Sequence, residues 1–71
     1  MLKKVEVVVP VSDLESTHVF NAIRFEAKEG CELTVFNTDT DSLIVNEITS
    51  ERVDAIAVFN RKGWQYWKRI E

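Results

Sequence analysis

The sequence predicts a mostly β (or α+β) fold of five to six short antiparallel strands, arranged as a curled sheet or small barrel. Short segments alternate apolar and polar residues, which is the period of a half-buried strand. Turn-forming clusters of glycine, asparagine and aspartate separate these segments at about ten-residue spacing. Hydrophobic residues make up 45% of the 71-residue chain. We therefore expect one small domain, residues 1–71, with a modest core.

The first strand is expected between Lys3 and Val11, which enclose a valine-rich run. Pro10 can close this strand because proline has no amide to donate to a sheet ladder. The next segment is ambiguous. Ser12 and Glu15 have the spacing of a helix capping box. One short helix after the first strand is therefore an alternative.

That helix could extend over residues 13–29 and give the order β-α-β-β-β-β. Its apolar residues share no single stripe at helical period, so a strand is favoured over the second half. A hairpin is then predicted around the loop Lys28–Gly30, with Gly30 in the left-handed region. Its predicted pairs are Ala27 with Cys31, Phe25 with Leu33, and Ile23 with Val35.

Three more strands are expected at Leu43–Ile48, Val53–Phe59 and Trp64–Ile70. The loop Arg61–Gly63 again ends in glycine, so the last two strands are predicted to form a hairpin in which Gly63 also has positive φ. Two registers remain open. A three-residue loop pairs Val58 with Tyr66, whereas a four-residue loop pairs Ile56 with Trp67.

Charge divides the chain into an acidic body and a basic C-terminal tip. Residues 1–58 hold five basic and eleven acidic residues, a net charge of −6, whereas residues 59–71 hold four basic residues and one acid, a net charge of +3. This balance disfavours general attraction to nucleic acid but permits local contacts by the tip.

No arrangement of catalytic or metal-binding residues stands out. Each candidate has a simpler structural interpretation: Cys31 as a buried thiol, His18 as an ordinary histidine, Asp39 and Asp41 as turn residues, and Glu26 and Glu32 as an exposed cross-strand pair. We expect no enzyme, no metal and no cofactor, because the chain has no phosphate-binding or nucleophile motif.

The residues predicted to bind a partner are Arg61, Lys62, Trp67 and Arg69. Trp64 and Tyr66 are expected to face the core, which would leave Trp67 exposed beside Arg69. Tryptophan and arginine are enriched in binding hot spots. The alternative is that Trp67 is itself part of the core.

These observations favour a non-catalytic protein-binding module, an adaptor or inhibitor, and a phage or mobile-element origin would fit. The alternatives are a single-stranded nucleic-acid-binding protein and a subunit of a larger enzyme. A single cysteine and the lack of a signal peptide indicate a cytoplasmic location, and no segment resembles a membrane span. Unpaired strand edges favour a homo-oligomer.

Overall fold

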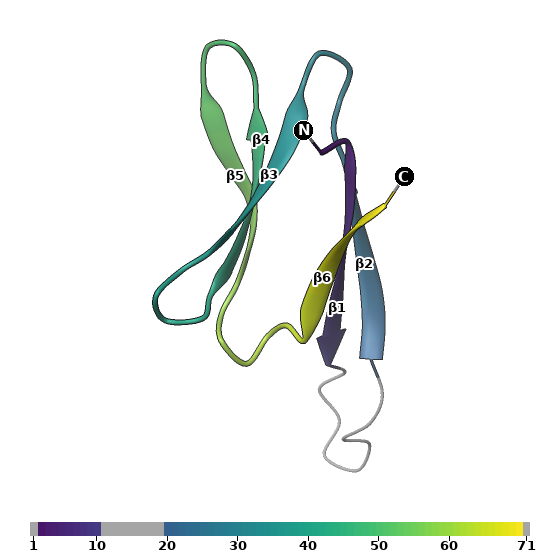
Figure 1. Ribbon diagram of the computed structural model, residues 1–71, viewed down its shortest axis with the longest axis vertical. Coiled ribbons are helices and arrows are strands. Elements are labelled where there is room, and N and C mark those ends of the chain that lie inside the picture. Colours follow the sequence, from purple (N-terminus) through teal and green to yellow (C-terminus); the bar gives the residue numbers. More distant parts are fainter. Residues whose placement is uncertain (1, 11–19, 71) are drawn as a thin grey trace.

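The computed structural model describes residues 2–10 and 20–70, and within these ranges it contains strands and turns but no helix (Figure 1). Six strands follow one another: β1 (Lys4–Pro10), β2 (Phe20–Glu26), β3 (Glu32–Asn37), β4 (Leu43–Ile48), β5 (Val53–Phe59) and β6 (Tyr66–Ile70). The mostly β prediction is confirmed. The strands form two antiparallel three-stranded sheets, β2-β1-β6 and β3-β4-β5, rather than a closed barrel.

The predicted helix start at Ser12 lies outside the described residues. The alternative helix over residues 13–29 is wrong for its second half, because Phe20–Glu26 is a strand that pairs with β1. The alternating side chains of this segment match the two-residue period of a strand.

The predicted hairpin between β2 and β3 is wrong, although its turn is present. Cys31 N donates to Lys28 O at 2.9 Å, and Gly30 has a φ of 83°, as predicted. Positive φ at the third position of a four-residue turn favours glycine. The turn leads from one sheet to the other, so β2 pairs with β1 and β3 pairs with β4.

The predicted hairpin between β5 and β6 is wrong for the same reason, since β6 pairs with β1. Neither predicted register exists. The connecting turn is closed by Gly63 N donating to Asn60 O at 2.8 Å, and the Asn60 Oδ1 atom accepts a bond from Lys62 N at 3.1 Å. With the asparagine side chain supporting the turn, Gly63 does not adopt positive φ, contrary to the prediction.

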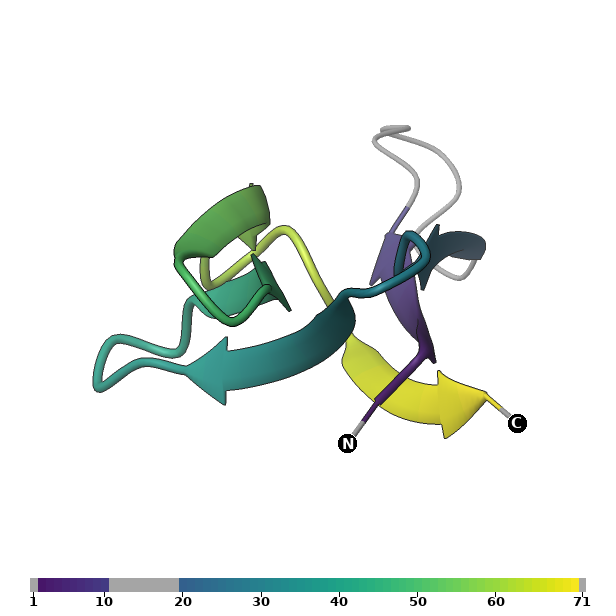
Figure 2. The same cartoon turned by 90° about the horizontal axis from the view of Figure 1, so that it is seen from above.

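Residues 2 and 3 join the two sheets at the start of β1. Leu33 N donates to Leu2 O and Ala27 N donates to Lys3 O, each at 2.8 Å. Leu2 thus forms an isolated antiparallel bridge with Leu33 of β3, just before the chain enters β1 of the other sheet. Seen from above, the two sheets occupy opposite sides of the molecule and are inclined to each other (Figure 2).

The core lies between the sheets and is small. Among residues 2–10 and 20–70, five apolar side chains are almost completely buried: Val5, Val7, Leu33, Leu43 and Val45. Alternate residues of β1, β3 and β4 supply them, as the period of a strand requires. Phe25 and Phe59 close one side in an edge-to-face contact with ring centroids 6.1 Å apart. Burial of each of the five aliphatic side chains contributes about 1.5–3 kcal/mol to the stability of the fold.

Candidate functional site

The structure does not bring the four predicted binding residues together on one strand pair. Arg61 and Lys62 are exposed in the turn after β5, whereas Trp67 and Arg69 lie in β6. Trp67 is opposite the fully buried Val7 and packs against the core, so the expectation that it is exposed is wrong. The register of β6 on β1, which the sequence did not reveal, determines this orientation.

Tyr66, the neighbour of Trp67 in β6, also has the opposite orientation to the one expected from the sequence. Tyr66 was expected to cover the core, but it lies opposite Val8 and is 50% exposed. Because successive residues of a strand point to opposite faces, placing Trp67 inward places Tyr66 outward. The aromatic side chain that β6 offers to solvent is therefore Tyr66.

The outer face of the sheet β2-β1-β6 carries a row of charges centred on Glu6. Arg24 Nε lies 3.2 Å from Glu6 Oε1, and Lys68 Nζ lies 3.5 Å from Glu6 Oε2. The hydrogen bond from Arg24 lowers the pKa of the Glu6 carboxyl; desolvation opposes this shift, and Lys68 adds to it. Lys4 and Glu26 form a longer pair at 3.9 Å. This face is largely neutralised by its own residues.

The outer face of β3-β4-β5 is different, because it exposes large apolar side chains. One cross-strand row consists of Phe36, Ile44 and Val58, in which Phe36 is 59% exposed and Val58 is 65% exposed. Val53 and Ile56 of β5 are also exposed. We call this surface the apolar face and define it by Phe36, Ile44, Ile48, Val53 and Val58. The row Thr34, Asn46 and Ala55 lies between Phe36–Ile44–Val58 and the pair Ile48–Val53.

A bulge in β5 adds one exposed apolar residue to this strand. Asn46 pairs with Ala55 and Val45 pairs with Ala57, so Ile56 is an additional residue without a partner on β4. A bulge of this kind bends the strand and increases its twist. The sequence contained a signal for the face: β4 begins Leu43-Ile44-Val45 and β5 contains Ala55–Phe59, both apolar on two faces rather than one.

Two turns of opposite charge border the apolar face at one end. β3 and β5 both run antiparallel to β4, so the turn after β3 and the turn after β5 lie at the same end of the sheet, at the bottom of Figure 1. The first turn holds Asp39 and Asp41, and the second holds Arg61 and Lys62.

The two turns are held in place by their own hydrogen bonds. Trp64 Nε1 donates to Asp41 O at 2.8 Å and links the second turn to the first. Ser42 N donates to Thr38 Oγ1 at 3.0 Å within the acidic turn. Asp41 has a φ of 62°, which aspartate in turns tolerates better than most residues.

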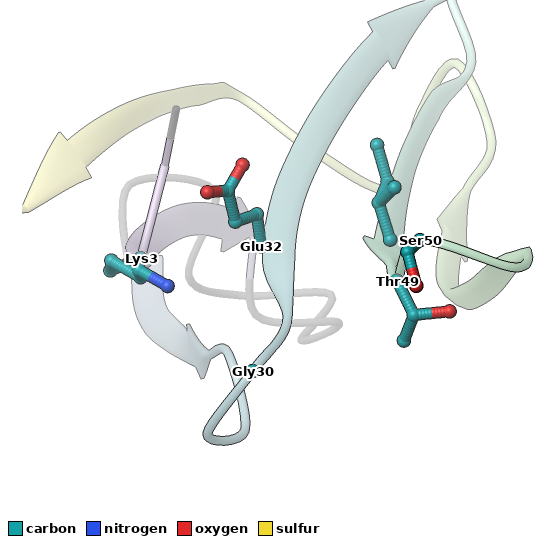
Figure 3. Close-up of a pocket in the computed structure, with 6 residues that line it drawn as sticks. Lys3, Gly30, Glu32, Thr49 and Ser50 are labelled. Atoms are coloured by element: carbon teal, nitrogen blue, oxygen red, sulfur yellow. The ribbon is translucent and has the colours of Figure 1, made fainter.

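A hollow of about 390 Å³ lies at the opposite end of the sheets (Figure 3). It is lined by Lys3, Gly30, Glu32, Ile48, Thr49 and Ser50. Two of its polar groups already have structural partners. Lys3 Nζ donates to Cys31 O at 2.9 Å, and Thr49 Oγ1 accepts bonds from two backbone amides of its own turn. The lining offers no base paired with a nucleophile.

The structure confirms one of the other expectations for single residues and contradicts another. Cys31 is buried, as predicted. Glu26 and Glu32 do not face each other, because they lie in different sheets; Glu26 is opposite Lys4, and Glu32 is opposite Ile48. His18 lies outside the described residues, and among those described no group of three potential metal ligands occurs.

Comparison of the chain with protein-family models, with curated proteins and with solved structures finds no match. Within the described ranges, no helix has the length and hydrophobicity needed to cross a bilayer.

Proposed function

We propose that this chain is a non-catalytic protein-binding module whose contact surface is the apolar face, bordered by Arg61 and Lys62. The observation that supports this most directly is the exposure of Phe36 and Val58, at 59% and 65%, in a row that is apolar on all three strands. Contiguous exposed apolar surface on a small protein marks a site of interaction.

The apolar face has properties suited to recognition. Its side chains stand on a hydrogen-bonded sheet, so little backbone entropy is lost when a partner binds. Phe36 supplies an aromatic group of the size found at interface hot spots. Arg61 and Lys62, in the turn that follows β5, add charge at the border, where it controls orientation and association rate more than affinity. An adaptor or an inhibitor could use such a surface without any chemistry of its own.

The alternative of single-stranded nucleic-acid binding has weaker support. It requires exposed aromatic groups beside basic ones. Trp67 packs against the core, and Asp39 and Asp41 lie at the same end of the sheet as Arg61 and Lys62. These acids would repel a phosphate backbone that approached the basic turn.

Site-specific photo-cross-linking tests the proposal. A photoreactive amino acid at position 58 should form adducts with protein in nuclease-treated lysate of the source cell, because Val58 lies on the apolar face. The matched control is the same group at position 66, since Tyr66 is similarly exposed on the outer face of the other sheet. Equal adduct yields at positions 58 and 66 would refute the proposal. Adducts at position 58 that disappear on nuclease treatment would indicate nucleic acid instead.

A further inference from the structure

We propose that the partner of the apolar face is a second copy of this chain, related by a two-fold axis parallel to the strands of β3-β4-β5. This inference rests on the proposed function, because it takes the apolar face as a docking surface. Two-fold dimers use the same patch on both copies, so the patch must be complementary to itself. The residues of the apolar face and its border meet that condition.

The strand order determines which residues meet. Rotation about an axis parallel to the strands places β3 of one copy opposite β5 of the other and leaves β4 opposite β4. Phe36 then faces Val58 of the second copy, and Ile44 faces its own equivalent. The exposed row Phe36–Ile44–Val58 therefore meets an identical row running in the opposite order across the sheet. Sheets packed in this way keep their strands within about 30° of each other.

The charged turns are complementary under the same rotation. The turn after β3 carries Asp39 and Asp41, and the turn after β5 carries Arg61 and Lys62. Both turns lie at the same end of the sheet, so the acidic turn of each copy lies opposite the basic turn of the other. Because the axis is two-fold, each dimer would contain two contacts between an acidic turn and a basic turn. Opposite charges facing each other across an interface favour one relative orientation over others.

The other face-to-face arrangement is less favourable. An axis perpendicular to the strands would place the row Phe36–Ile44–Val58 against the row that pairs Glu32, Ile48 and Val53. The charged turns at one end of the sheet would then lie against the opposite end of the second copy's sheet, so the acidic and basic turns would not meet. Of these two arrangements, only the parallel axis brings the oppositely charged turns together across the interface, so it is preferred.

The size of the face sets the expected strength of the dimer. Three strands about 4.8 Å apart, with about six residues rising 3.4 Å each, give a face of roughly 14 by 20 Å. Stable interfaces bury about 800 Å² per partner. The sheet surface alone is smaller than this, so the charged turns must contribute and the dimer should dissociate at micromolar concentrations and in high salt.

Reversing the charge of one turn provides the sharpest test. Sedimentation velocity, across the micromolar range in low salt, measures the self-association of each variant. One variant carries Arg61→Glu with Lys62→Glu, and the other carries Asp39→Lys with Asp41→Asn; asparagine suits the positive φ of position 41. Each variant alone should self-associate at least tenfold more weakly than the wild type. An equimolar mixture of the two should form a heterodimer, because acidic turns then meet only basic turns.

Two further variants separate the apolar face from other surfaces. Val58→Lys should abolish dimerisation, whereas Tyr66→Lys, on the outer face of the other sheet, should leave it unchanged; circular dichroism verifies folding of both. A wild-type chain that is monomeric at high micromolar concentration, or a mixture that forms no heterodimer, would overturn the inference. Neither result would refute the proposed function. That proposal is tested separately by cross-linking at positions 58 and 66, which detects any protein partner.

Discussion

At the scale of single residues, the orientation of Trp67 changes the interpretation of β6. The side chain packs against the core opposite Val7, so its removal should affect folding first. We predict that Trp67→Ala lowers the free energy of unfolding by roughly 2–3 kcal/mol, somewhat less than for a fully buried tryptophan. Urea denaturation measures this value. Tyr66→Ala is the matched control and should cost less than about 1 kcal/mol; equal costs for the two variants would contradict the assigned register.

Gly30 is the glycine whose conformation matters. Its φ is 83°, and a Cβ added there would meet no atom within 4 Å, so any cost of substitution comes from the backbone and not from crowding. We predict that Gly30→Ala destabilises the fold by about 1 kcal/mol. Gly30→Asn should cost less, because asparagine tolerates the left-handed region. Thermal denaturation of both variants checks the order, and a smaller loss for alanine than for asparagine would rule out this explanation.

The Glu6 carboxyl should make the stability of the fold depend on pH in the acid range. Arg24 and Lys68 lower its pKa below the usual glutamate value of 4.5 in the folded state. The ionised carboxylate therefore stabilises the fold fully above about pH 4.5, and this contribution is lost as the pH falls through the lower folded pKa. Glu6→Gln should flatten the dependence of stability on pH in that acid window.

The matched control for Glu6 is Glu51→Gln, an exposed residue of the turn before β5. Denaturation midpoints measured between pH 3 and pH 7 give the comparison. If Glu6→Gln and Glu51→Gln keep the same pH profile as the wild type, the charge row on β2-β1-β6 has no energetic role.

At the scale of elements, the sequence predicted the strands well and their pairing poorly. Alternation and turn residues located every strand that the structure contains, and the tight turn at Gly30 was identified correctly. The partner of a strand depends on where the chain goes after a turn. A turn such as Lys28–Cys31 can close a hairpin or connect two sheets with the same hydrogen bond and the same glycine.

The expected orientations of Trp67 and Tyr66 were wrong for the same reason. Whether Trp67 or Tyr66 faces the core depends on the partner of β6, and the sequence suggested β5 where the structure has β1. Arg61 and Lys62 were placed in an exposed turn correctly, because turn chemistry is local. The apolar face was missed because a strand apolar on both faces looks the same in sequence whether its second face is buried or exposed.

Engineered disulfides distinguish the two pairings directly. In a Cys31→Ala background, Val8→Cys with Tyr66→Cys should form a disulfide on mild oxidation, because these residues lie opposite each other on β1 and β6. Val58→Cys with Tyr66→Cys should not, because β5 and β6 belong to different sheets. Intact mass measurement after alkylation of free thiols reports the result. The reverse pattern would support the hairpin expected from the sequence.

At the scale of the whole molecule, the two small sheets give an extended shape. The radius of gyration is 13.0 Å, against about 11 Å expected for a compact chain of this length. The shortest extent is 14 Å, so much of each sheet remains close to solvent. In the part of the chain that the structure describes, only five apolar side chains are almost fully buried, so self-association would add to the stability of the fold.

The link between self-association and stability predicts a melting temperature that depends on protein concentration. If two copies associate through the apolar face, the midpoint of thermal unfolding should rise by several degrees between low and high micromolar concentration, because binding favours the folded state. Val58→Lys should remove this rise without lowering the midpoint measured at low concentration. A melting temperature independent of concentration for the wild-type chain would contradict the expectation.

The hydrogen bond that Leu2 accepts also restricts motion between the sheets. Leu33 N on β3 donates to Leu2 O just before β1, so the angle between the sheets cannot open without breaking this bond, whereas the bond from Ala27 N to Lys3 O continues the ladder of β1 and β2 within one sheet. Hydrogen exchange makes this measurable at two amides. The amide of Leu33 should exchange faster than that of Ala27 under conditions where exchange requires opening of the structure, because separation of the sheets exposes Leu33 N while Ala27 N stays bonded to Lys3 within its own sheet.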